Sequence, residues 1–110
     1  MPSLVSPQIE IADDFEAVQR LYLDRGWSDG LPIVPPTLQR VEAMLAATSL
    51  ASHHVVAEIP TIWGAATVEK LAINAVMAGC LPEYLPVLIA AVEAIADPVF
   101  NLYAIQATTH

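Results

Sequence analysis

The stretch that decides the fold runs from residue 67 to residue 95 and reads TVEKLAINAVMAGCLPEYLPVLIAAVEAI. Its apolar residues recur at helical spacing, and its Gly and Pro residues divide it into two helices. We expect the first helix to be capped by Thr67 and to end at Gly79 and Cys80. Its predicted inward face comprises Val68, Leu71, Ala72, Ala75, Val76 and Gly79.

The second helix of this stretch is expected to begin between Pro82 and Tyr84, because Pro suits a first helical turn. It is predicted to run to Ala96, where the following Asp-Pro pair ends it. Glu93 is the main polar exception along its length, so the sequence predicts a helix that is buried nearly all round.

Two more helices are expected earlier in the chain. From Asp13 to Gly26, the residues Phe15, Val18, Leu21 and Tyr22 recur at helical spacing. GWSDGLPIVPPT (26–37) is too rich in Gly and Pro for a helix, and predicts a turn followed by extended chain. Thr37 then caps a helix to about Ala46, whose expected inward side chains are Leu38, Val41, Met44 and Leu45.

Two strands complete the prediction. VVAEIP (55–60) indicates a strand, TIWGAA (61–66) a loop, and VFNLYAIQATT (99–109) a second strand. The expected fold is α/β or α+β, with two helical pairs alternating with two strands. Because two strands alone make no stable sheet, we expect a second polypeptide or a copy of this chain to complete it. Residues 1–110 then form a single domain that is one half of a unit completed in trans.

The composition supports a chain that associates. It is 55% apolar and 15% charged, against about 45–50% and 25% in typical globular proteins. Polar and Pro residues interrupt the long apolar run, so no membrane span is expected, and the N-terminus does not resemble a signal peptide. A net charge of −8 makes nucleic acid an unsuitable partner. The single cysteine fits a reducing compartment, which predicts a cytoplasmic protein.

Three residues are candidate catalytic groups: Cys80, Glu83 and His110. Cys80 lies between two helices, where it is either a small buried hydrophobe or a reactive thiol. Glu83, in the first turn of the next helix, is either a surface carboxylate or a general acid or base beside the thiol. His110 ends a polar cluster after an apolar strand, and is either frayed or part of a pocket wall.

Five residues are candidate substrate contacts: Trp27, Asp29, Asn74, Thr108 and Thr109. Trp27 and Asp29 sit in a stiff loop, where Trp27 serves either as a ligand lid or as a packing anchor. Asn74 interrupts an apolar helix, and a buried amide there would need hydrogen-bond partners. The histidines at 53 and 54 could ligate a metal but are expected to be exposed, so no metal site is predicted; the sequence indicates no particular cofactor.

Three stretches together resemble a known family: GWSDGLPIVPPT, ATVEKLAINAVMAGCLPEYLPVLIAAVEAI and FNLYAIQATTH. They resemble the N-terminal part of the bacterial UGSC-type (seleno)protein group and relatives loosely labelled thiol-disulfide isomerases. The resemblance covers residue 13 to the end, and longer members continue beyond the position of His110. The resemblance implies that this chain is either one part of a split protein or a fragment of a longer one. It also implies a reactive thiol or selenol elsewhere in the family, and so it gives no reason to assign that role to Cys80.

The functional hypothesis is a small subunit of a heteromeric cytoplasmic enzyme acting on a small molecule. Thiol-dependent redox, lyase and hydrolase chemistry all stay open, with the partner subunit expected to supply most catalytic groups. Two alternatives stand beside it. One is a non-catalytic structural or regulatory subunit, and the other is a metal-binding module that uses Cys80 and histidines.

Overall fold

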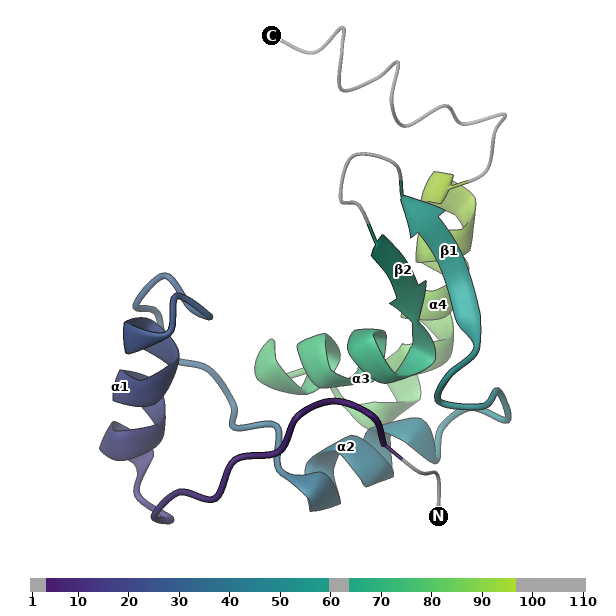
Figure 1. Ribbon diagram of the computed structural model, residues 1–110. Coiled ribbons are helices and arrows are strands. Elements are labelled where there is room, and N and C mark those ends of the chain that lie inside the picture. The colour runs from purple at the N-terminus through teal and green to yellow at the C-terminus, as the bar shows by residue number, and fades with distance from the viewer. Residues whose placement is uncertain (1–3, 60–63, 97–110) are drawn as a thin grey trace, which may run out of the picture.

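The computed structural model describes residues 4–59 and 64–96, and these form a mixed helix and strand fold of α+β type (Figure 1). The elements, in chain order, are α1 (Phe15–Asp24), α2 (Leu38–Leu45), β1 (Val55–Ile59), β2 (Gly64–Thr67), α3 (Val68–Met77), the 3-10 turn η1 (Pro82–Tyr84) and α4 (Leu85–Ala96). All four predicted helices are therefore confirmed, and the strand predicted at 55–60 is confirmed over Val55–Ile59. The strand predicted at 99–109 lies outside the described residues.

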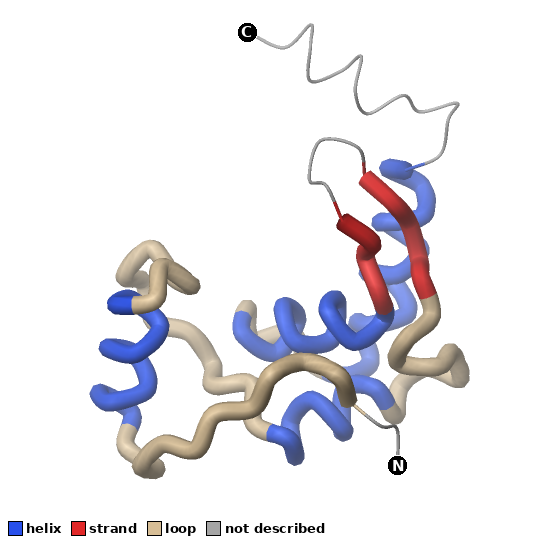
Figure 2. The backbone as a smooth tube through the Cα atoms, in the orientation of Figure 1, coloured by secondary structure: helices blue, strands red, loops and turns tan. Residues whose placement is uncertain are grey.

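β1 and β2 form an antiparallel hairpin, seen in red in Figure 2. Ala57 pairs with Ala66 and Glu58 with Ala65, and a register shift follows Val55. The predicted loop over 61–66 is thus wrong for residues 64–66. Gly and Ala have low strand propensity, so nothing in that sequence indicates a strand; pairing with β1 imposes it.

The core lies among α2, α3 and the start of α4. Its nine buried side chains are Val41, Met44, Leu45, Val68, Ala72, Ala75, Val76, Leu85 and Ile89. Val56 of β1 packs against this cluster, and α4 lies against β1. Leu38, predicted to face inward, is 48% exposed because it occupies the first position of α2, beyond the end of the core.

The prediction that α4 is buried nearly all round is wrong for the described residues. Only Leu85 and Ile89 of its twelve residues are buried. Val87 is 66% exposed and Ile95 is 38% exposed. β1 and α3 cover one side of α4, which leaves an apolar side facing outward.

The helix ends follow the predicted chemistry. The hydroxyls of Thr37 and Thr67 accept hydrogen bonds from backbone N–H groups three residues on, each at 3.2 Å. Gly26 and Gly79 follow α1 and α3 with φ of 70° and 82°. In both cases the N–H groups of the glycine and of the residue after it donate to carbonyls of the last helical turn in the pattern of a Schellman motif, which ends the helix.

α1 stands apart from the remaining helices (Figures 1 and 2). None of its side chains is buried, and none packs against the core. Phe15, on its apolar side, is 60% exposed. Its predicted amphipathic pattern is real, but the described residues cover the apolar side only in part: Val18, Leu21 and Tyr22 are half-buried. Among the helices in the described ranges, none has the length and hydropathy needed to cross a membrane.

Candidate functional site

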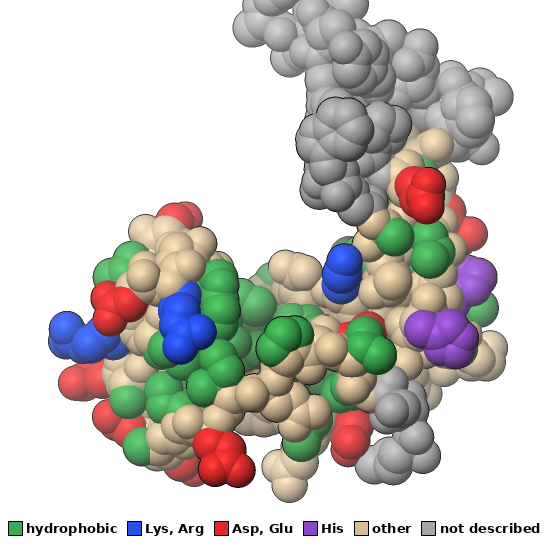
Figure 3. All heavy atoms as spheres, in the orientation of Figure 1, with side chains coloured by type: hydrophobic (Ala, Val, Ile, Leu, Met, Phe, Trp, Pro, Cys, Tyr) green, Lys and Arg blue, Asp and Glu red, His purple; other side chains and the backbone are tan. Residues whose placement is uncertain are grey.

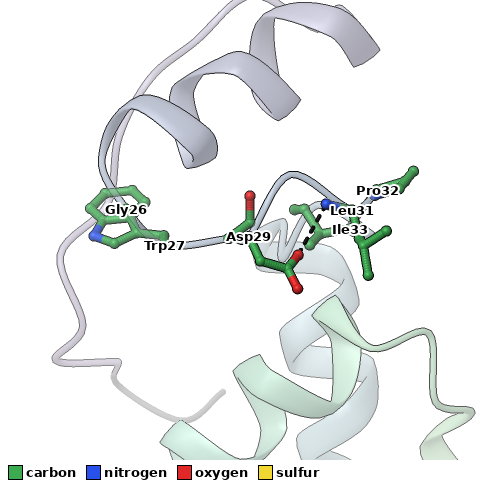
Figure 4. A pocket seen from close by; sticks show the side chains of 7 residues that line it. Gly26, Trp27, Asp29, Leu31, Pro32 and Ile33 are labelled. Atoms are coloured by element: carbon green, nitrogen blue, oxygen red, sulfur yellow. Dashed lines mark hydrogen bonds between the residues drawn. The ribbon is translucent and has the colours of Figure 1, made fainter.

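A shallow concavity lies in the loop that follows α1. Gly26, Trp27, Ser28, Asp29, Leu31, Pro32 and Ile33 line a shallow, open hollow of about 490 Å³ (Figure 4). Two predicted substrate contacts, Trp27 and Asp29, therefore line the same hollow. In Figure 4, Trp27 lies at one end and Pro32 at the other, with Asp29 between them.

Local hydrogen bonds shape the floor of this hollow. Asp29 Oδ1 accepts a 3.0 Å hydrogen bond from the Leu31 N–H, which is the Asx turn expected from the Ser-Asp-Gly sequence. Gly30 supplies a φ of 101°, which side-chain-bearing residues rarely adopt. The turn occupies one oxygen of an exposed carboxylate, so the other can face a ligand.

Trp27 is anchored on one side and open on another. Its ring meets the Tyr22 ring edge-on, with centroids 5.2 Å apart, and the Arg25 guanidinium lies 5.3 Å from its centroid. Burial raises the pKa of the Tyr22 hydroxyl, so that group stays protonated at neutral pH. Trp27 is nevertheless 46% exposed, so it serves as a packing anchor that still offers indole surface to the hollow.

The end of the loop is fixed to two helices. The Gln19 side chain accepts from the Ile33 N–H at 2.9 Å and donates to the Ile33 carbonyl at 2.8 Å. One residue later, the Val34 N–H donates to the Met77 carbonyl of α3 at 3.1 Å. This role of Gln19 was not predicted from the sequence, although a glutamine on the inner side of an amphipathic helix could have indicated it.

The three other candidates that the structure describes do not line the hollow. Cys80 is half-buried and packs against the core. Glu83 is exposed on η1. Asn74 is also exposed, and its side chain donates to the Lys70 carbonyl within its own helix at 2.8 Å. The structure thus brings Trp27 and Asp29 together, but it does not gather Cys80, Glu83 and Asn74 around them.

The remaining candidates are histidines and threonines. His53 and His54 are exposed, as predicted. Within residues 4–59 and 64–96, no three His, Cys, Asp or Glu side chains are grouped so that they could hold a metal ion. Thr108, Thr109 and His110 lie outside the described residues.

A buried carboxylate that the sequence did not indicate lies at the start of α3. Glu69 is 3% exposed and accepts hydrogen bonds from the N–H groups of Val5 and Ser6, at 3.0 and 2.9 Å, and from the Ser6 hydroxyl. Its own N–H donates to the Ser52 carbonyl at 2.8 Å. The N-terminal segment is thereby tied to α3. The contact spans more than sixty residues of sequence, so only a Glu in the first turn of an apolar helix could have hinted at it.

The comparisons with known proteins found no match to this chain: no family model, no curated protein and no solved structure matches it. The resemblance to the UGSC-type group stays a prediction, carried by the three sequence stretches alone.

Proposed function

We propose that this chain is one subunit of a heteromeric assembly, and that it contributes the hollow at Gly26–Ile33 to a small-molecule pocket shared with its partner. The observation that carries the proposal is the outward side of α4. Eleven residues of this helix are uncharged and largely apolar, yet only Leu85 and Ile89 are buried. Burying an exposed Val or Ile side chain is worth roughly 1.5–3 kcal/mol, so a partner that covered α4 would stabilise the assembly substantially.

The pocket half of the proposal depends on the loop after α1. The hollow is open on its outer side, so a ligand resting in it would need a second wall. A partner would supply that wall and the main catalytic groups. Trp27 would offer an aromatic surface, and Asp29 would offer a carboxylate to a hydroxyl, amine or amide of the substrate. Thiol-dependent redox, lyase and hydrolase steps all stay open within the proposal.

A second candidate function is a purely structural subunit. It is favoured by the positions of Cys80 and Asn74, which do not line the hollow: Asn74 bonds to its own helix and Cys80 packs against the core. Both candidates need a partner, and they differ in whether the hollow contacts substrate.

Sedimentation velocity on the isolated chain tests the shared part of both proposals. We expect concentration-dependent self-association or poor solubility at micromolar concentration, and a single species of fixed stoichiometry once the partner subunit is co-expressed. A cooperatively melting monomer at all concentrations would contradict both. In the assembled complex, loss of turnover in Asp29→Asn with intact assembly favours the enzyme, whereas unchanged turnover favours the structural subunit.

A further inference from the structure

The outward side of α4 forms a continuous apolar surface, which we call the outer face of α4. It consists of Val87, Ala90, Ala91, Ala94 and Ile95, all of which are exposed. These positions share one side of the helix, opposite the buried Leu85 and Ile89. Three of the five are alanines, so another helix could pack with its axis about 8 Å away.

The charged side chains of α4 and of the adjoining η1 have one sign. Glu83 on η1 and Glu93 on α4 are exposed carboxylates, and these two elements contain no Lys or Arg. The chain has four Lys and Arg residues, and they belong to other elements: Arg20, Arg25, Arg40 and Lys70 lie on α1, its C-cap, α2 and α3. In Figure 3 most of the basic side chains in view lie over α1, on the side away from the hairpin. The outer face of α4 therefore has an apolar centre with two carboxylates beside it, Glu83 and Glu93, which we call its acidic rim.

An acidic rim decides which partner suits the apolar centre. A second copy of this chain would place carboxylates against carboxylates, and would join two molecules that each carry a net charge of −8. An anionic membrane surface would be repelled for the same reason. A helix with an apolar stripe and Lys or Arg beside it would gain contact area and complementary charge together.

We propose that the outer face of α4 docks a helix of a separate polypeptide, and that this helix has an apolar stripe flanked by Lys or Arg. The proposal rests on the proposed function, because it names the chemistry of the partner subunit. Basic residues on that helix would meet Glu83 and Glu93 at the rim, while apolar side chains would pack over Val87 and the alanines.

Two synthetic amphipathic helices with the same Leu and Ala stripe, one flanked by Lys and one by Glu, test the proposal against the full chain. By fluorescence anisotropy we expect the Lys peptide to bind at least about tenfold more tightly at about 50 mM NaCl, with the difference shrinking at about 500 mM NaCl because salt screens the rim. Val87→Glu should abolish binding. Leu38→Glu, at an exposed position of α2, is the matched control and should leave binding unchanged.

A double substitution, Glu83→Lys with Glu93→Lys, leaves the apolar centre intact and should reverse the preference between the two peptides. Equal affinity for both peptides, or binding of neither, would overturn the inference. If the chain dimerises and Val87→Glu abolishes the dimer, the outer face of α4 binds a second copy of the chain. If the chain binds phosphatidylserine vesicles and Val87→Glu abolishes that binding, the face binds a membrane. Either result would overturn the inference. Equal affinity would leave the assembly proposal standing, because sedimentation tests that proposal separately.

Discussion

The side chain of Gln19 pairs with the backbone of Ile33 as one strand pairs with another, through one donated and one accepted hydrogen bond. A single amide thus fixes the distal end of the Gly26–Ile33 hollow to α1. No other hydrogen bond between described side chains and the loop spans so many residues, since Ser28 and Asp29 bond only within their own turn.

Gln19→Ala should therefore loosen the loop without unfolding the core. Loss of the bond to the Ile33 N–H is expected to speed hydrogen exchange of that amide about tenfold, which corresponds to about 1.4 kcal/mol. Amides of α3 should exchange at their original rate. Gln39→Ala, at an exposed position of α2, is the control and should alter neither rate.

Asp29→Ala and Asp29→Asn separate the turn from the charge. Asn keeps an oxygen that can accept from the Leu31 N–H, whereas Ala removes the acceptor. Nuclear magnetic resonance of the Leu31 amide should show loss of protection in Asp29→Ala and little change in Asp29→Asn. Equal protection in both variants would show that the Asx turn does not hold the loop.

Gly79→Ala should destabilise the chain through the backbone rather than through crowding. An added Cβ would meet Val34 Cγ2 at 3.8 Å, an ordinary contact, but a φ of 82° disfavours alanine. We expect about 1 kcal/mol of lost stability in urea denaturation. Gly26→Ala carries the same strain at φ 70°, but it lies beside α1, outside the core, and should leave the unfolding of the core unchanged.

Glu69 should give the fold an acid-sensitive contact. Burial alone would raise the pKa of its carboxyl. Three other effects outweigh burial and lower this pKa below the ordinary 4.5: hydrogen bonds from the Ser6 side chain, hydrogen bonds from the backbone of Val5 and Ser6, and the nearby charge of Lys70. Because the pKa of Glu69 is lower in the folded than in the unfolded chain, the ionised carboxylate contributes to the free energy of unfolding above pH 4.5. This contribution is lost as the pH falls through the folded pKa.

Glu69→Gln tests this acid sensitivity. An amide nitrogen would face a backbone N–H, so the variant should lose about 2 kcal/mol at neutral pH. Its free energy of unfolding should also decline less than that of the wild type below about pH 4.5. Glu93→Gln, at an exposed position of α4, should reproduce the wild-type profile. Parallel acid profiles for wild type and Glu69→Gln would contradict the role of this carboxylate.

The two sides of α4 should respond differently to truncation. Leu85 is fully buried, so Leu85→Ala is expected to cost about 2–5 kcal/mol. Val87 is 66% exposed, and Val87→Ala in the isolated chain should cost less than about 0.5 kcal/mol. Chemical denaturation measures both. A comparable loss at Val87 would mean that another copy of the chain already covers the outer face of α4.

Local chemistry explains which parts of the fold were predictable. Thr37, Thr67, Gly26 and Gly79 act on their own neighbours, so caps and helix ends could be derived from sequence. The Asp29 turn is equally local, and it correctly indicated the loop that carries the hollow.

Long-range contacts explain what was missed. β2 is a strand because β1 pairs with it, and Glu69 is buried because Ser6, 63 residues away, bonds to it. Apolar composition predicted that α4 is buried nearly all round, and this was wrong because composition does not reveal how many sides of a helix other elements cover. For the same reason the separation of Cys80, Glu83 and Asn74 from the hollow could not be derived from their order in the chain.

The isolation of α1 has a consequence for how the protein melts. Since α1 contributes no side chain to the core, its helix can fray while α2, α3 and α4 remain packed. Calorimetry of the free chain should then record a transition whose van't Hoff enthalpy falls below the calorimetric one. In an assembly in which the partner contacts both α1 and α4, the van't Hoff and calorimetric enthalpies would converge, because the chain would unfold in a single cooperative step.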